Sequence, residues 1–177
     1  RARCDEVARL ATEQRNPRTL DLDMLSPAAI LDRICAEDRT VADAVARELS
    51  FVARAVELVV ASFREGGRLI YVGAGTSGRL GVLDASECPP TFGSDPNMVQ
   101  GVIAGGAQAL VRAVEGAEDR EDEGERSMRD LEVGPRDTVI GLAASRRTPF
   151  VVAAVRLARR LGARTAYVTC TPREEFH

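Results

Sequence analysis

The stretch Leu69-Ile70-Tyr71-Val72-Gly73-Ala74-Gly75-Thr76-Ser77-Gly78 decides the fold class. Its first four residues form a short apolar run closed by glycines, which is typical of a strand buried on both faces of a parallel sheet. The glycines and hydroxyls that follow lead into a helix expected from Ser77 to Ser86, which Pro89-Pro90 is expected to stop. A strand followed directly by a helix is the repeating unit of an α/β protein.

The same alternation continues along the chain. Further strands are expected over 99–104, 138–142 and 165–169, and further helices over 107–114, 118–131 and 148–161. Alternating strands and helices predict a doubly wound parallel sheet in a three-layer αβα arrangement. Only eight residues follow the fourth strand, so no helix is expected to cover it. We therefore expect a sheet domain that is incomplete at its C-terminal end.

An N-terminal segment precedes this sheet. The polar stretch from Thr12 to Thr19 contains a proline and predicts a loop. Ser26-Pro27 predicts a helix start, because serine caps helices and proline suits the first helical position. From Val41 to Phe63 the apolar residues recur at steps of three and four, which is helical spacing. We expect a loop and helical segment over 1–40 and the sheet domain over 41–177.

The composition argues against several kinds of chemistry. All 24 basic residues are arginine, and the single histidine is the last residue, His177. Without lysine the chain has neither a Schiff-base lysine nor a P-loop lysine. One terminal histidine argues against a Ser-His-Asp triad and against a histidine-rich metal site. Acid–base chemistry is therefore expected to fall to carboxylates.

Charge and cysteine spacing narrow the expected partners and compartment. The formal net charge is −3, which argues against a nucleic-acid partner. No apolar run approaches the roughly 20 residues of a membrane span, so no membrane partner is expected. The four cysteines lie far apart with no C-x-x-C pair, which predicts neither a zinc knuckle nor a disulfide framework. A reducing, cytoplasmic location is the expectation.

Two strand ends of the expected sheet are rich in hydroxyl groups. The candidate ligand-binding residues are Gly75, Thr76, Ser77 and Gly78 in the first loop and Ser145, Arg147 and Thr148 in the second. Ligands of open α/β sheets bind at the carboxyl ends of strands. Glycines let the backbone approach a phosphate, and N–H groups at a helix start attract it. The loops predict a phosphate site, although the alternative that Ser77 and Thr148 only cap helices stays open.

The first loop also matches G-x-G-x-x-G, the dinucleotide-binding fingerprint. That fingerprint requires an acidic residue about 20 positions on, at the end of the second strand. Asp95 has the right offset but precedes the expected second strand, which ends in Ala104-Gly105-Gly106. The dinucleotide interpretation is therefore disfavoured, and no cofactor and no metal is expected.

Two glutamates stand out among the carboxylates. Glu87 comes just before Pro89-Pro90, which is expected to turn the chain abruptly and direct Glu87 into the cleft. Glu118 follows Gly116 and is expected to open the helix over 118–131. The residues alone rank these two above the other acids, most of which are expected on a solvated helix face.

In these loops the chain resembles a known family, the bacterial N-acetylmuramic acid 6-phosphate etherases of the sugar isomerase (SIS) fold. The matching segments are Thr12-Glu13 with Asn16, Gly73–Phe92, Gly101–Gly106, Glu115–Asp119 and Ala143–Pro149. The resemblance covers nearly the whole chain, and the block around Glu87 is its most specific part. One departure is Arg146, which stands where the family has glycine. Family members also continue beyond this chain, so the isolated 177 residues are expected to be less stable and inactive.

The resemblance implies a lyase that needs no cofactor. It would cleave the D-lactyl ether of N-acetylmuramic acid 6-phosphate to N-acetylglucosamine 6-phosphate and D-lactate, a step in cell-wall amino sugar recycling. Glu87 would be the acid/base of elimination and rehydration and Glu118 the second acid/base, both with pKa values raised by burial. The loop of Thr12, Glu13 and Asn16 would approach the site, and the protein would be a homodimer.

Two other functions stay open at this stage. One is a non-catalytic sugar-phosphate sensor of the glucokinase-regulator type, which is similar in the same loops and controls a partner. The other is a sugar-phosphate isomerase of the same fold, which would interconvert aldose and ketose without releasing lactate. Affinity without turnover would indicate the sensor, and lactate release would indicate the etherase.

Overall fold

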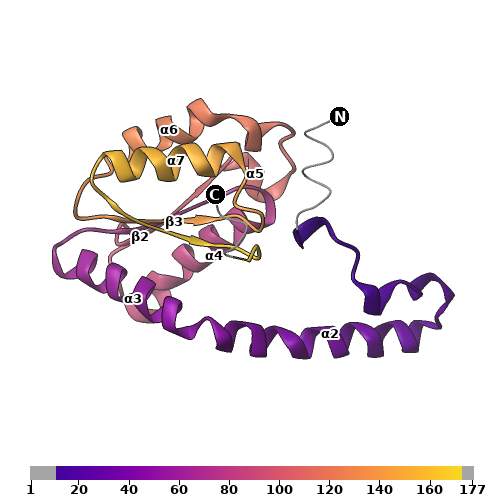
Figure 1. Cartoon of the computed structure of the whole chain (residues 1–177). Helices are drawn as coiled ribbons and strands as arrows, with labels where there is room; N and C mark the ends of the chain where they lie inside the picture. Colours follow the sequence, from indigo (N-terminus) through magenta and orange to yellow (C-terminus); the bar gives the residue numbers. More distant parts are fainter. Residues whose placement is uncertain (1–10, 173–177) are drawn as a thin grey trace. The chain divides into compact units, whose positions relative to one another are not determined.

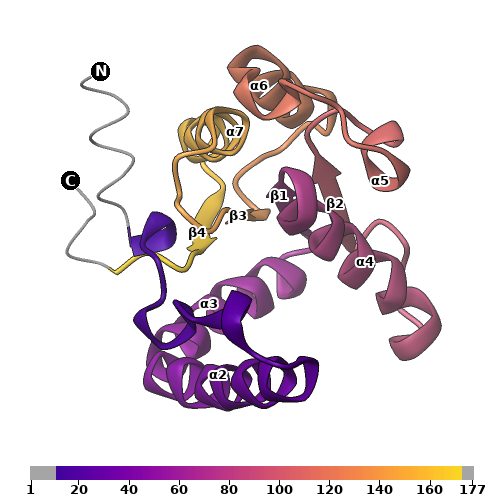
Figure 2. The ribbon, with the colours of Figure 1, turned by 90° about the vertical axis from the view of Figure 1, so that its right-hand side faces the viewer.

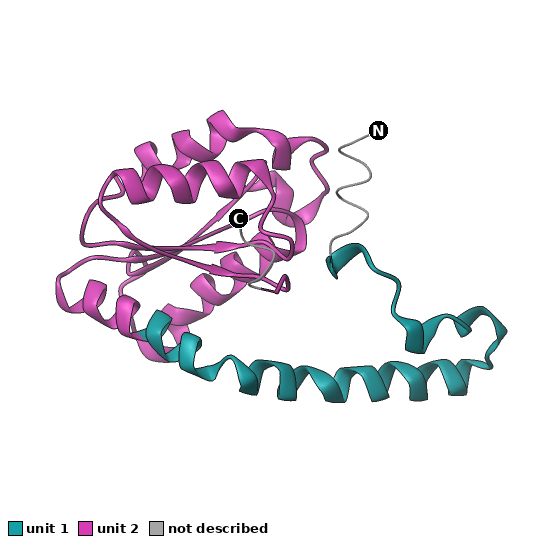
Figure 3. Ribbon diagram, in the orientation of Figure 1, with its two compact units in different colours: residues 1–56 teal, residues 57–177 magenta. Residues whose placement is uncertain are grey.

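The computed structural model describes residues 11–172 of the chain (Figure 1). The chain divides into two compact units, residues 1–56 and 57–177 (Figure 3). The first ten residues of the predicted N-terminal segment lie outside the described part. The boundary predicted after residue 40 falls within a helix, 16 residues before the division between the two units.

The first unit consists of short turns followed by helix. Three 3₁₀ turns, Ala11–Glu13, Pro17–Thr19 and Leu22–Met24, precede helix α2, which spans Pro27–Arg47. This helix begins as predicted, because the Ser26 Oγ accepts the N–H of Ala29 and Pro27 takes the first helical position. The continuous helix expected from Val41 to Phe63 is interrupted at Glu48, after which α3 spans Leu49–Arg64.

The second unit is built on a parallel sheet. Its strands are β1 (Leu69–Gly73), β2 (Val99–Ile103), β3 (Thr138–Leu142) and β4 (Arg164–Val168). The strand order is β2-β1-β3-β4, and every neighbouring pair is parallel. Because β1 and β3 are neighbours, the loops that follow them open at the same, carboxyl edge of the sheet.

Helices cover both faces of this sheet, which confirms the predicted three-layer fold. The helices after β1 are α4 (Gly75–Phe92), α5 (Gln108–Val111), α6 (Glu121–Asp130) and α7 (Pro149–Arg160). The α6 and α7 helices pack together on one face, and α4 lies on the other (Figures 1 and 2). On the face that α7 covers, the helix contributes Phe150 and Val151 to the core. On the face that α4 covers, the helix contributes Ala85.

Helix α4 is longer than the sequence analysis predicts. Pro89 and Pro90 lie inside it, and it ends only at Gly93, whose φ of 64° is left-handed and whose N–H donates to the Pro89 carbonyl. The prediction that the prolines stop the helix and turn the chain after Glu87 is therefore wrong. Each proline removes one helical hydrogen bond, and the packing of α4 along β1 and β2 outweighs that loss.

Close contacts fix the direction of α4 across the sheet. A Cβ on Gly78 would lie 2.7 Å from Ile103 Cγ1 and 2.9 Å from the carbonyl carbon of Gly73, at the carboxyl ends of β2 and β1. Seven residues later, Ala85 packs with Leu69 and Val99, the first residues of the same strands. The helix therefore runs antiparallel to β1, from the carboxyl edge of the sheet to its amino edge.

An ion pair holds the amino edge of the sheet. Asp137, just before β3, is buried and accepts the backbone N–H groups of Arg68 and Gly134 at 2.9 and 3.0 Å. The Arg68 guanidinium also donates to both Asp137 carboxylate oxygens, at 3.1 and 2.8 Å. Burial alone would raise the pKa of Asp137, but these hydrogen bonds and the arginine charge together lower it.

Within residues 11–172, no helix is both long enough and apolar enough to cross a bilayer. In that same part of the chain, no three side chains of histidine, cysteine, aspartate or glutamate gather where they could hold a metal ion.

Candidate functional site

The first hydroxyl loop forms the start of α4. Thr76, Ser77 and Gly78 occupy its first turn, and Gly75 has a left-handed φ of 53°. The first N–H groups of a helix have no intrahelical partner and attract anions. Within the described residues, the Ser77 hydroxyl has no hydrogen-bond partner, so it remains available to a ligand. The start of α4 thus offers several donors at the carboxyl edge.

The second hydroxyl loop connects β3 to α7. Thr148 is the residue before α7, but its hydroxyl forms no capping hydrogen bond. The Ser145 hydroxyl likewise has no partner in the described part of the chain. Ser77 also lies within α4 rather than at its cap, which is Ala74. The alternative that Ser77 and Thr148 only cap helices is therefore not supported.

Arg146 adopts an unusual backbone conformation in the second loop. Its φ is 55°, in the left-handed region that favours glycine. Its N–H donates to the Ala143 carbonyl at 3.0 Å, which closes a tight turn over residues 143–146. Its guanidinium carbon lies 5.8 Å from the ring centroid of Tyr167 on β4, within range of a cation–π contact. The conformation accounts for glycine at this position in the family that the sequence resembles.

We expect Arg146→Gly to leave the protein more stable than Arg146→Ala by about 1 kcal/mol. Both substitutions remove the contact with Tyr167, but only glycine relieves the left-handed conformation. Thermal unfolding of the two variants side by side measures the difference. Equal stability would show that the backbone at residue 146 carries no strain.

Glu118 lies at the same edge as the hydroxyl loops. It belongs to the 3₁₀ turn η4, Ala117–Asp119, and Ala117 anchors this turn in the core. A Cβ on Gly105, just after β2, would lie 3.3 Å from the Ala117 Cβ. The prediction that Glu118 opens the long helix is wrong, because the backbone at Arg120 is not helical and α6 begins only at Glu121.

Glu87 lies at the opposite edge. It follows Ser77 by ten residues of continuous helix, which corresponds to about 15 Å along the axis. It also lies beyond Ala85, which packs against the first residues of β1 and β2. A single chain therefore does not bring Glu87 to the hydroxyl loops or to Glu118. Both glutamates are exposed, so the burial expected of an acid/base pair is not found within the chain.

Tyr71, on the middle of β1, packs under the part of α4 that carries Glu87. Burial, followed by its interaction with Asp84 on α4, raises the pKa of Tyr71. The phenol therefore stays protonated.

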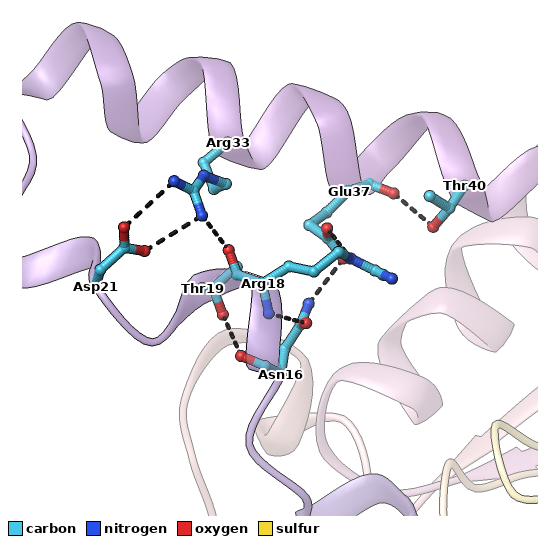
Figure 4. A network of polar contacts seen from close by, with 7 residues as sticks. All are labelled: Asn16, Arg18, Thr19, Asp21, Arg33, Glu37 and Thr40. Carbon is cyan, nitrogen blue, oxygen red and sulfur yellow. Dashed lines mark hydrogen bonds and ion pairs between the residues drawn. The ribbon is translucent and has the colours of Figure 1, made fainter.

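The predicted loop of Thr12, Glu13 and Asn16 lies in the first unit, where the Asn16 side chain is bonded to α2 (Figure 4). The Asn16 Nδ2 donates to the Glu37 carboxylate at 2.7 Å, and its Oδ1 accepts the Arg18 N–H. Hydrogen bonds from Arg18 and then Asn16 lower the pKa of Glu37 to about 2. Asn16 thus joins the segment before α2 to that helix, and its approach to the hydroxyl loops stays a prediction.

Two residues at the carboxyl edge were missed by the sequence analysis. The hydroxyls of Thr169 and Thr171 both donate to the Ala144 carbonyl, in the second hydroxyl loop. The signal in the sequence was a Thr-x-Thr pair at the end of the fourth expected strand. These bonds depend on the pairing of β3 with β4, which the residues of the second hydroxyl loop do not themselves indicate.

Comparisons with known proteins agree with this fold. Residues 51–159 match the family described as the glucokinase regulatory protein N-terminal SIS domain. An N-acetylmuramic acid 6-phosphate etherase of Bacillus cereus (strain AH820) is 53% identical over 167 residues, 94% of this chain and 57% of that protein. A protein of the same name from Geobacillus sp. (strain WCH70) is 53% identical over 170 residues, 96% of this chain and 58% of that protein. The chain thus spans less than two thirds of these relatives.

A solved structure shows the same fold. Phosphoheptose isomerase from Neisseria gonorrhoeae superposes with a TM-score of 0.62, covering 80% of this chain and 73% of the isomerase. The sequences are 16% identical, so this likeness concerns the fold alone.

Proposed function

The chain belongs to the SIS-domain family described by the N-terminal SIS domain of glucokinase regulatory protein, and from this premise we propose that the intact protein is an N-acetylmuramic acid 6-phosphate etherase. Its similarity to etherases over more than nine tenths of its length supports an enzyme of that kind. The observation that carries the proposal is the pair of hydroxyl loops at one sheet edge, whose Ser77 and Thr148 side chains cap no helix.

The two loops would hold the 6-phosphate of the sugar. The N–H groups at the start of α4 and the hydroxyls of Ser77, Ser145 and Thr148 supply donors without any lysine. Arg147, in the second loop, adds a positive charge. Binding through the phosphate leaves the rest of the sugar free to meet the glutamates.

For the reaction itself, the protein then needs to supply only groups that transfer protons. In the open-chain sugar the aldehyde acidifies the C2 proton, which a carboxylate removes. The C3–O bond to the lactyl group breaks, and D-lactate leaves with a proton from an acid. Water adds to the resulting double bond, with its oxygen at C3 and a proton returned to C2. We propose that Glu87 removes the C2 proton and returns it, and that Glu118 assists ring opening.

A second copy of the chain would complete the site. Glu87 lies at the amino edge of its own sheet, whereas the hydroxyl loops and Glu118 lie at the carboxyl edge. We therefore propose a homodimer in which Glu87 of one copy reaches the loops of the other. The same contact would bury Glu87, which is exposed in the single chain.

The decisive measurement is D-lactate release. The intact protein is expected to release D-lactate from N-acetylmuramic acid 6-phosphate and to leave N-acetylglucosamine 6-phosphate. Removal of the phosphate from the substrate should abolish turnover, because the loops would then lack their ligand. Aldose–ketose interconversion without lactate would instead identify a sugar-phosphate isomerase. We place the reaction in the cytoplasm, in the recycling of cell-wall amino sugars.

The family match favours one alternative, a sugar-phosphate sensor of the glucokinase-regulator type. Such a protein would use the same loops to bind a sugar phosphate and control a partner. Affinity for N-acetylglucosamine 6-phosphate with no lactate release, together with a co-purifying kinase, would establish the sensor and overturn the etherase.

A further inference from the structure

The Ala144 carbonyl, in the second hydroxyl loop, accepts three hydrogen bonds from the chain just after β4. The Thr169 Oγ1 donates at 2.7 Å, the Thr171 Oγ1 at 2.9 Å and the Cys170 N–H at 2.9 Å. A carbonyl oxygen has two lone pairs, so three donors exceed its usual complement. Thr171 is buried, and its N–H in turn donates to the Thr169 hydroxyl at 3.2 Å, so the two threonines form one cluster.

This carbonyl belongs to the central peptide of a tight turn. The Arg146 N–H donates to the Ala143 carbonyl, so Ala144 and Ser145 are the two central residues. The two common turn types differ by a flip of this central peptide. Hydrogen bonds that hold its carbonyl toward β4 therefore select one of the two orientations.

The same peptide carries the Ser145 N–H. The described chain contains no cis peptide bond, and in a trans peptide the N–H and C=O point in opposite directions. The Ser145 N–H therefore points away from Thr169 and Thr171. Among the residues that the structure describes, this N–H donates to no backbone carbonyl. It is a fixed donor at the edge where the phosphate would bind.

The three bonds also affect the strength of this donor. Hydrogen bonds accepted by a carbonyl polarise its peptide, and the N–H of that peptide becomes a better donor. We propose that Thr169 and Thr171 are positioning residues that aim the Ser145 N–H at the bound phosphate. This inference rests on the proposed phosphate site, and neither threonine needs to touch the ligand.

The test uses the intact protein with both threonines replaced by valine, which keeps the shape and removes the hydroxyls. Thr165→Val, on β4 just before these residues, is the matched control. Calorimetry measures the affinity for inorganic phosphate and for N-acetylglucosamine 6-phosphate. We expect the T169V/T171V protein to lose about tenfold or more in both affinities, as for loss of one hydrogen bond to a charged group. The control should bind normally.

Two further readouts separate positioning from a merely structural role. In protein labelled with ¹⁵N-serine, phosphate should shift the Ser145 amide signal in the unsubstituted protein and not in T169V/T171V. The KM should rise with kcat nearly unchanged, and T169S/T171S, which restores both hydroxyls, should recover the affinity.

The outcomes distinguish this inference from the function on which it rests. Equal phosphate affinity in the unsubstituted and T169V/T171V proteins would overturn the positioning role and leave the etherase standing. Absence of phosphate binding in the unsubstituted protein would overturn both. Lactate release without a phosphate-induced shift at Ser145 would overturn the positioning role alone.

Discussion

Co-expression of the Glu87→Gln and Glu118→Gln variants is expected to restore etherase activity that neither variant has alone. Each substitution removes one proton-transferring group, so each homodimer should lose about a thousandfold in kcat. In a mixed dimer, one site combines the Glu118 of one copy with the Glu87 of the other. Random assembly makes half of the dimers mixed, each with one intact site, so about a quarter of the full activity should return.

The prediction follows from the direction of α4, which carries Glu87 away from the loops of its own chain. D-lactate release by the unseparated co-expressed protein is the measurement, and the purified mixed dimer, with one intact site of two, should show about half of the full activity. The matched control pairs Glu87→Gln with the double variant Glu87→Gln/Glu118→Gln, a combination that supplies no intact Glu87 and should stay inactive. A mixed dimer no more active than its parents would refute the shared site. Normal turnover by Glu87→Gln alone would refute the role of Glu87.

Replacement of Asp137 by alanine is expected to destabilise the protein by about 3 kcal/mol or more. The substitution leaves the half-buried Arg68 guanidinium without its carboxylate and the Gly134 N–H without its acceptor. The midpoint of urea unfolding at neutral pH measures the loss. The matched control is Arg129→Ala, which breaks an exposed ion pair with Glu125 and should cost less than about 1 kcal/mol.

The pH dependence of this effect has a definite sign. The pKa of Asp137 is lower in the folded protein than in the unfolded chain. Its contribution is therefore complete above about pH 4 and disappears as the pH falls through the folded pKa. The gap in stability between the unsubstituted protein and Asp137→Ala should narrow in acid. A gap that stays constant down to pH 2 would show that the Asp137 charge contributes nothing.

The strands and most of the helices of the second unit could be predicted from the sequence. Apolar runs bounded by glycine, such as Leu69–Val72, mark buried strands because few other patterns fit a sheet covered on both faces. The end of α4 could not be predicted in this way. Proline usually ends a helix, but packing on β1 and β2 keeps α4 helical through Pro89 and Pro90. The same rule misplaced Glu87, although helical rise alone separates it from Ser77.

Other parts of the site depend on contacts between residues distant in the sequence. The bonds from Thr169 and Thr171 to Ala144 exist only because β3 and β4 are neighbours in register. The left-handed conformation of Arg146 is a property of the folded turn, and nothing in an arginine indicates it. The places of both hydroxyl segments, directly after strands, were predicted correctly because glycines and hydroxyls at strand ends are local features, although Gly75 and Thr76 already belong to α4.

The strand order has a consequence for how the chain folds. The central pair of the sheet joins β1 to β3, with Leu69 opposite Thr138. Strand β2 is synthesised before β3 but pairs with only one side of β1, at the edge of the sheet. During synthesis, β1 must therefore keep one side unpaired until residue 142 has emerged. Pairings between distant segments close large loops and slow the folding of a domain. Until then β1 exposes an apolar edge, so nascent chains of this length are candidates for chaperone binding.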